Sequence, residues 1–193
     1  MRAITLDIES ISDSAVRGRV DVAEQELTVV AIHDSETGAF SAFTREELPA
    51  LWPILEAADL LVGFNSDTFD IPLLNRYYPG DLARIRSLDL LSEVAAALGR
   101  RIRLQSLAEA TLKAGKSGDG LKAQDWWRAG RYEEVKKYCI EDVRLTRKLF
   151  DYALEHGSLK YKDLREIREI KLDTAHWLAE SPESATLTHA LPL

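Results

Sequence analysis

The chain contains one cysteine and one methionine among its 193 residues. The single cysteine, Cys139, excludes an internal disulfide and favours a reducing compartment, so we expect a cytoplasmic protein. No apolar run approaches the roughly 20 residues that a transmembrane helix needs, so we expect no membrane partner. The amino-terminal segment leads directly into a strand-like pattern and has no signal-peptide features.

The chain also has fewer positive than negative side chains, with 25 Lys and Arg and 32 Asp and Glu, which gives a net charge of −7. A protein that binds nucleic acid through bulk electrostatics is normally basic. Attraction for a polyanion must therefore be local or come from bound cations. The one dense basic cluster is Arg100, Arg101 and Arg103, which we interpret as a solvated loop, with a phosphate contact as the alternative. Trp126 and Trp127 are interpreted as core packing rather than as a base-stacking platform.

The remaining composition, 46% apolar and 30% charged, is that of a folded chain long enough for one sizeable core. Alternating patterns predict strands at 2–9, 26–34, 38–43, 59–64 and 87–90. Helical patterns predict helices at 45–58, 72–78, 91–98, 105–113 and 132–156, the last ended by Gly157. Residues 159–172 alternate like strands in some fragments and are helix-like in others.

Four acidic residues in three short motifs are candidates for chemistry. Asp7 and Glu9 end the first strand pattern, and residues two apart in a strand point to the same face. In α/β proteins with parallel strands, ligand-binding sites lie beyond the carboxyl ends of these strands, and Asp7 and Glu9 fall at such an end. The alternative is an ordinary solvated strand end, because a D-x-E motif is weak by itself.

Asp142 interrupts an apolar helical stripe. Val135, Tyr138, Asp142, Leu145 and Leu149 recur at steps of three and four, which places them on one face of a helix. A carboxylate on a core face requires a cation, a hydrogen-bond donor or an altered pKa. The alternatives are a salt bridge to an arginine or the solvated edge of the stripe.

The loop after the fourth strand pattern holds two rival acids, Asp67 and Asp70. Asp70 precedes Pro72 closely and fits an ordinary helix N-cap, while Asn65 fits an ordinary turn residue. The residue types alone leave the choice between Asp67 and Asp70 open.

Taken together, the motifs resemble the DEDDy-type 3′–5′ exonucleases of the ribonuclease H-like superfamily, and most closely the exonuclease domain of B-family DNA polymerases. The three matching segments are Leu6–Glu9, Gly63–Pro72 with its Phe69-Asp70 pair, and Tyr138–Asp142. The resemblance covers about residues 2–150 and selects Asp70 over Asp67. It implies an α/β fold, with a mixed five-stranded sheet, the first strand central and helices on both faces. We expect this domain to span residues 1–157, with 158–193 a C-terminal extension packed on it and ending in a loose tail.

The resemblance also implies roles for the matching residues. Asp7, Glu9, Asp70 and Asp142 would hold two Mg²⁺ or Mn²⁺ ions, which suit oxygen-only ligands. Tyr138 would orient the attacking water, and Asn65 and Phe69 would contact the substrate. The expected activity is 3′–5′ hydrolysis of phosphodiester bonds at the 3′ end of single-stranded nucleic acid, and we expect this nucleic acid to be DNA rather than RNA. The enzyme would act alone or as a subunit of an unidentified larger complex.

Two other functions belong to different classes. The first is a catalytically silent ribonuclease H-like module that binds nucleic acid or a partner protein, although such a module has no need to keep every acidic residue. The second is a metal-dependent phosphodiesterase for dinucleotides or small nucleotides. Whether Mg²⁺ or Mn²⁺ raises the melting temperature discriminates the silent module. Products formed from a length series of oligonucleotides discriminate the phosphodiesterase.

Overall fold

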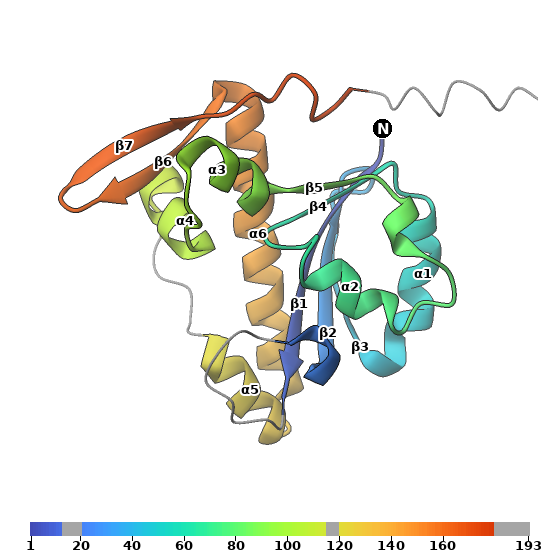
Figure 1. The fold of residues 1–193 in the computed structure, drawn as a ribbon. Coiled ribbons are helices and arrows are strands. Elements are labelled where there is room, and N and C mark those ends of the chain that lie inside the picture. Colours follow the sequence, from blue (N-terminus) through green and yellow to red (C-terminus); the bar gives the residue numbers. More distant parts are fainter. Residues whose placement is uncertain (13–20, 115–119, 180–193) are drawn as a thin grey trace, which may run out of the picture.

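A mixed five-stranded sheet forms the centre of the molecule (Figure 1). The structure, a computed structural model, describes residues 1–12, 21–114 and 120–179. The sheet order is β3-β2-β1-β4-β5, antiparallel from β3 to β1 and parallel from β1 to β5. The strands are β1 Ala3–Ile11, β2 Glu26–Asp34, β3 Phe40–Thr44, β4 Leu60–Gly63 and β5 Ser87–Asp89. The predicted α/β fold with a central first strand is confirmed.

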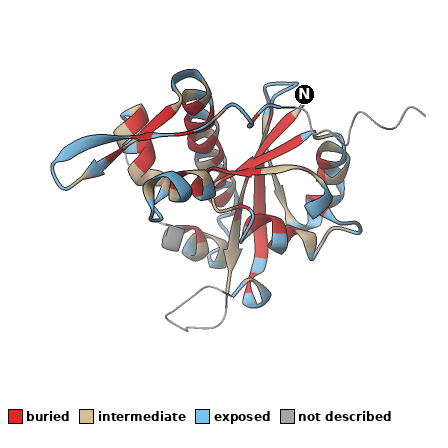
Figure 2. Cartoon of the chain, turned by 45° about the horizontal axis from the view of Figure 1, so that its top comes forward, coloured by how far each residue is buried: buried red, intermediate tan, exposed pale blue. Residues whose placement is uncertain are grey.

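Helices cover both faces of this sheet (Figure 1). On one face, alternate β1 residues such as Ile4, Leu6 and Ile8 pack against helices α1 (Leu48–Glu56) and α2 (Asp70–Asn75). On the opposite face lies α6 (Tyr132–His156), packed against β1 and β2. Buried residues fill the central strands and the side of α6 turned toward them (Figure 2). The period-two pattern of β1 therefore assigns its odd-numbered residues to the α6 side.

Helix α6 has the bounds that the sequence predicts, because its signals are local. Its apolar residues recur at helical spacing over 25 residues, and Val135, Cys139, Val143 and Leu149 are all fully buried. Gly157 ends the helix in the left-handed conformation, at φ 62°. This conformation disfavours residues with a Cβ, so glycine stops the helix here.

Other helices differ from prediction mainly at their ends. The segment predicted at 45–58 begins with a 3₁₀ turn, η2 (Arg45–Glu47), before α1, and α2 begins two residues earlier than predicted. The remaining helices are α3 Leu90–Leu98, α4 Leu104–Leu112 and α5 Gly120–Arg128, with 3₁₀ turns η1 Val22–Glu24 and η3 Leu82–Arg84. Helix α5 was not predicted, although Ala123, Trp126 and Trp127 recur at helical spacing. It carries Trp126 and Trp127, which are half-buried against α6 as the core-packing interpretation expects.

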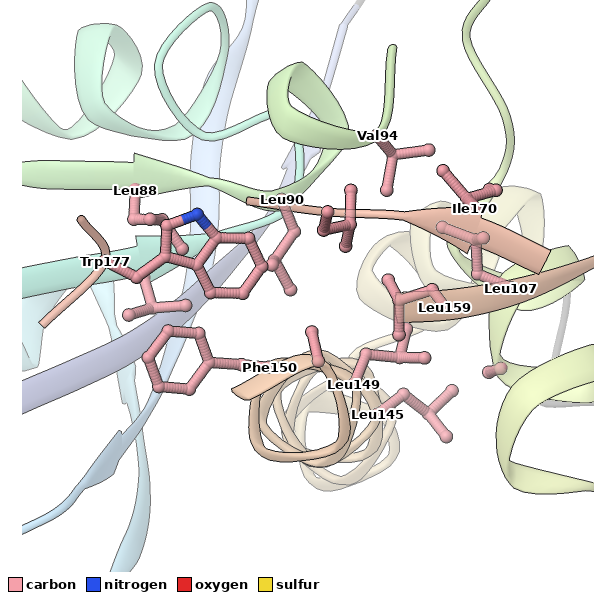
Figure 3. Close-up of a cluster of buried hydrophobic side chains, with 14 of the residues drawn as sticks. Leu88, Leu90, Val94, Leu107, Leu145, Leu149, Phe150, Leu159, Ile170 and Trp177 are labelled. Carbon is pink, nitrogen blue, oxygen red and sulfur yellow. The ribbon is translucent and has the colours of Figure 1, made fainter. Parts of the chain in front are cut away.

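The ambiguous stretch after α6 forms a hairpin of β6 (Ser158–Asp163) and β7 (Glu166–Lys171). Figure 3 shows side chains from this hairpin, including Leu159 and Ile170, in one cluster with α6. Trp177 is fully buried there and stacks on Phe150 at a centroid distance of 5.7 Å. Residues 158–177 thus share the core of the first 157 residues. The tail expected from residue 180 lies outside the described residues, and the domain division remains a prediction.

Across the described parts of the chain, no helix combines the length and apolar character needed to cross a membrane.

Candidate active site

Asp7 and Glu9 project from β1 toward helix α6. Leu6 and Ile8, which alternate with them, join the apolar cluster on the other face of the sheet. The ladder with β2 pairs Asp7 with Ala31 and Glu9 with Val29, and its register shifts directly after Glu9. Glu9 pairs with Val29 and Ser10 with Leu27, so Thr28 is an extra residue of β2 and forms a β-bulge beside the second carboxylate.

Helix α6 supplies the third carboxylate. Asp142 lies one helical turn after Tyr138, and ligand oxygens of Asp7, Glu9 and Asp142 all lie within 4.8 Å of one another. The Tyr138 hydroxyl donates a hydrogen bond to the Asp142 carboxylate. The ring of Trp126 meets Tyr138 edge-on, at a centroid distance of 6.2 Å. No salt bridge to Asp142 is formed within residues 1–12, 21–114 and 120–179, so the arginine alternative has no support there.

Asp70 is the fourth acid, beside this group of three. Its side chain is only 4% exposed, and its charge acts on both Asp7 and Glu9. The structure makes Phe69 the N-cap residue of α2 and Asp70 its first helical residue, so the N-cap interpretation of Asp70 was wrong. The rival acid, Asp67, is exposed to solvent. The loop therefore turns Asp70, rather than Asp67, toward the other carboxylates.

Burial raises the pKa of all four carboxyl groups, with desolvation the largest cause in each case. The pKa rises to about 8 for Glu9, about 7 for Asp70 and about 6 for Asp142, and that of Asp7 lies well above its usual range. Repulsion from the neighbouring carboxylates adds to the rise for Asp7 and Glu9. A cation among these groups would remove the repulsion and favour their charged forms.

The hydroxyl of Tyr138 is held in its neutral form. Burial, followed by the charge of Asp142, raises the pKa of the Tyr138 phenol. The phenol therefore keeps its proton at neutral pH and remains a hydrogen-bond donor.

Cys139 also touches the cluster, which the sequence did not predict. It is fully buried, and its Sγ atom lies 3.3 Å from the backbone oxygen of Asp7 and 3.5 Å from Oδ2 of the same residue. Its position between Tyr138 and Asp142 on a predicted core helix was the available signal. The thiol is a weak hydrogen-bond donor that faces both the backbone oxygen and the side chain of Asp7.

The loop that carries Asn65 follows β4 in a tightly constrained path. A Cβ atom on Gly63 would lie 2.3 Å from Cβ of Ser66, so the backbone closes there only around glycine. Asn65 has φ 71°, a left-handed conformation that asparagine tolerates better than most residues. Buried Asp89 accepts hydrogen bonds from the backbone N–H groups of Asn65 at 2.7 Å and Leu91 at 2.9 Å. The sequence did not predict that Asp89 holds the Asn65 loop, although an acid directly before a helix is a recognisable N-cap signal.

An open pocket of about 450 Å³ lies beside the cluster. Its lining residues are Asp7, Phe64, Asn65, Leu91, Arg101, Ile102, Arg103 and Leu104. Asn65 thus adjoins the carboxylates as expected, whereas Phe69 packs against the core on the α1 side of the sheet and is absent from this lining. The predicted substrate contact of Phe69 has no counterpart in this pocket.

Oxygen atoms are the only ligands offered by Asp7, Glu9 and Asp142. Hard divalent cations such as Mg²⁺ and Mn²⁺ prefer carboxylate oxygens, so the donor set fits them. The raised pKa values point the same way, because burial makes the ionised carboxylates costly and a cation would offset that cost.

Comparison with known proteins gives the family. The sequence model of the RNase H superfamily matches residues 6–154, and the chain belongs to this superfamily. Curated protein sequences yield no match. Among solved structures, the chain is similar to the family B DNA polymerase from the hyperthermophilic archaeon Pyrobaculum calidifontis, with 19% identity and a TM-score of 0.62. The similarity covers 79% of this chain and 24% of the polymerase chain, so the likeness concerns a quarter of that protein and shows the fold. The resemblance drawn from the three motifs is confirmed at this level.

Proposed function

We propose that the chain is a metal-dependent 3′–5′ exonuclease that removes nucleotides from the 3′ end of single-stranded nucleic acid, DNA rather than RNA. One observation carries the proposal: three carboxylates from β1 and α6 gather their oxygens within 4.8 Å, with a tyrosine hydroxyl bonded to one of them. Membership of the RNase H superfamily and the fold shared with a DNA polymerase support it.

The proposal assigns a role to each acidic residue. Asp7, Glu9 and Asp142 would hold one Mg²⁺ or Mn²⁺ ion, and Asp70 would hold a second together with Asp7. Bound divalent ions supply Lewis-acid stabilisation of the charge that develops on the phosphate oxygens. Asp7 and Glu9 lie on a strand and Asp142 lies on a packed helix, so the carboxylate oxygens of these residues are held in place without loop movement.

Tyr138 and Asn65 would act on the reactants. The protonated Tyr138 hydroxyl, anchored at Asp142, would orient the attacking water toward the phosphorus atom. The Asn65 amide would position the terminal nucleotide at the pocket entrance, and Phe69 remains a predicted substrate contact. We place this activity in the cytoplasm, on the basis of the single unpaired thiol, and leave a larger complex as a further part of the proposal.

The test uses 5′-labelled single-stranded DNA and RNA with Mg²⁺, Mn²⁺ or EDTA, read as a product ladder. We expect stepwise shortening from the 3′ end with either ion and none with EDTA. Asp7→Ala and Asp142→Ala should each reduce the rate at least about a hundredfold, because transition-state charge stabilisation is lost. Asp70→Ala should also lower the rate, and Asp67→Ala is its matched control, since Asp67 precedes Asp70 closely in the chain and only Asp70 is buried. Full activity in EDTA or in Asp7→Ala contradicts the proposal.

A further inference from the structure

The pocket beside Asp7 has a basic wall formed by Arg101 and Arg103. Both residues lie in the short connection between α3 and α4, and both line the pocket. Arg100 differs, because its guanidinium lies over the ring of Tyr161, at 5.4 Å from the ring centroid. The arginine cluster is therefore divided, with two members at the pocket and one packed on the hairpin.

Arg101 is linked to the site through Asn65. Its Nη2 donates to Oδ1 of Asn65, which also accepts a hydrogen bond of 2.7 Å from the Thr68 hydroxyl. Two donors on the amide oxygen leave the Nδ2 group as the part of Asn65 that a ligand can use. The backbone of the same residue is held by Asp89. The Arg101 side chain is therefore held by Asn65, whose backbone is itself hydrogen-bonded to Asp89, and it does not extend freely into solvent.

Arg101 and Arg103 share the lining of the pocket with Asp7. Within the described ranges of the chain, neither Arg101 nor Arg103 takes part in a salt bridge, whereas Arg131, Arg144 and Arg147 each pair with an acid. The chain as a whole carries a net charge of −7. Two unpaired guanidinium groups facing a pocket in an acidic protein indicate an anionic ligand, and the planar donors of arginine match phosphate oxygens.

The rest of the lining limits what that anion belongs to. Phe64, Leu91, Ile102 and Leu104 add apolar surface beside the arginines, and Asp7 connects the pocket to the carboxylate cluster. The volume of about 450 Å³ lies within the range of sites for small organic molecules. A nucleotide unit combines an apolar base face with a phosphate, so it fits both parts of the lining.

We propose that Arg101 and Arg103 bind a second phosphate of the strand, one that is distinct from the phosphate cleaved at the carboxylates. This inference rests on the proposed exonuclease function and specifies its substrate class: a strand that carries a further phosphate next to the scissile linkage. That phosphate is either the neighbouring backbone linkage or a phosphate on the 3′ terminus. Arg101 and Arg103 then supply affinity, and the carboxylates supply the chemistry.

Binding is tested first, in EDTA, so that the result is independent of hydrolysis. The probe is a fluorescently labelled single-stranded DNA oligonucleotide, and its Kd is measured over a salt series for wild type, Arg103→Ala, Arg101→Ala/Arg103→Ala and Arg100→Ala. We expect the double variant to raise Kd at least about tenfold and to reduce the magnitude of the salt slope by about 0.7 per lost phosphate contact. Arg100→Ala should bind like wild type. Arg103→Ala leaves the Asn65 contact intact, so its loss of affinity reports charge rather than loop damage.

Hydrolysis then identifies the phosphate. Replacement of the linkage next to the scissile one by an uncharged methylphosphonate should raise KM for wild type, with little change in kcat, and should leave the double variant unaffected if the backbone linkage is bound. A 3′-phosphate should lower KM for wild type alone if the terminal group is bound. Equal KM values for the double variant and Arg100→Ala on every substrate overturn the inference.

The two proposals fail separately. Arginine-dependent binding without nuclease activity in Mg²⁺ or Mn²⁺ contradicts the proposed function and supports a phosphate site. Full nuclease activity with binding that is independent of Arg101 and Arg103 overturns the phosphate site alone.

Discussion

The buried thiol of Cys139 donates its proton toward Asp7, with Sγ 3.3 Å from the backbone oxygen and 3.5 Å from Oδ2. This contact joins α6 to the first metal-ligand candidate on β1. Burial raises the pKa of the thiol, so it remains a neutral donor at physiological pH.

Cys139→Val should weaken metal binding while it preserves the core, because valine fills a similar volume without a donor. One lost hydrogen bond is worth about 1 kcal/mol, which corresponds to roughly a fivefold weaker affinity for Mn²⁺. Cys139→Ser keeps a donor and is the matched control. The measurement is the increase in melting temperature as Mn²⁺ is titrated into each protein. Identical titrations for Cys139→Val and wild type contradict the positioning role.

Asp142→Asn and Asp70→Asn should make the metal-free protein more stable and inactive. Each removes an ionisable group whose burial is unfavourable in the charged form, and functional sites commonly carry such a cost. We expect a gain of about 0.5–2 kcal/mol in the free energy of unfolding in EDTA at neutral pH. Mn²⁺ should stabilise wild type and help the variants much less.

Chemical denaturation with EDTA or Mn²⁺ measures these differences. Asp67→Asn serves as the control, because Asp67 is an exposed acid that precedes Asp70 closely in the chain. If both site variants unfold more easily than wild type in EDTA, and Mn²⁺ has no effect on wild type, the acids do not form a metal site.

Tyr138→Phe should lower the rate of hydrolysis and leave substrate affinity nearly unchanged. The variant loses the hydroxyl bonded to Asp142 but keeps the ring that packs against Trp126. The loss should be large yet smaller than that of Asp142→Ala, because the carboxylates remain. Single-turnover rates and KM for the two variants measure this difference. A fully active Tyr138→Phe protein makes this tyrosine a packing residue only.

The stability of the metal-free protein should fall as the pH rises from about 5 to 8. The folded-state pKa of Glu9 is raised from 4.5 to about 8, so its contribution to stability is complete below pH 4.5 and is lost as the pH rises through 8. Asp34 shifts in the opposite direction, since Arg2 lowers its pKa, and its contribution is lost only in stronger acid.

Divalent ions should reverse this trend, because they replace the protons that the carboxylates release. The stabilisation by Mn²⁺ should therefore grow between pH 5 and 8. Melting temperatures across this range, with EDTA and with Mn²⁺, provide the measurement. A stabilisation by Mn²⁺ that does not depend on pH contradicts the coupling of protons and metal at Glu9.

Local signals in the sequence define some elements and leave others open. The limits of α6 were predictable because an apolar stripe of period 3.6 runs into Gly157. The hairpin after it was ambiguous, since its identity as a pair of strands depends on packing against α4 and α6. Helix α5 is only nine residues long, so the helical spacing of Ala123, Trp126 and Trp127 is a short signal in the sequence, and these side chains pack against the α6 face.

Some residues of the candidate site were also predictable from local patterns, whereas others were not. The side chains of Asp7 and Glu9 share one face because strands have a period of two, and the helical stripe turns Asp142 toward the sheet. The choice of Asp70 over Asp67 depends on the path of a loop, which is fixed by the close approach of Gly63 to Ser66 and by distant Asp89. No local pattern specifies such contacts, so only a resemblance or a structure selects Asp70.

The carboxylates and the pocket are built on different kinds of element. Asp7, Glu9 and Asp142 belong to a central strand and a long packed helix, whereas Asn65, Arg101 and Arg103 belong to connections between elements. Connections accept substitutions and insertions more readily than packed strands and helices do. If the proposed activity holds, substrate preference can therefore change over evolutionary time, or in directed evolution, through a few loop residues, while the carboxylate site is inherited intact.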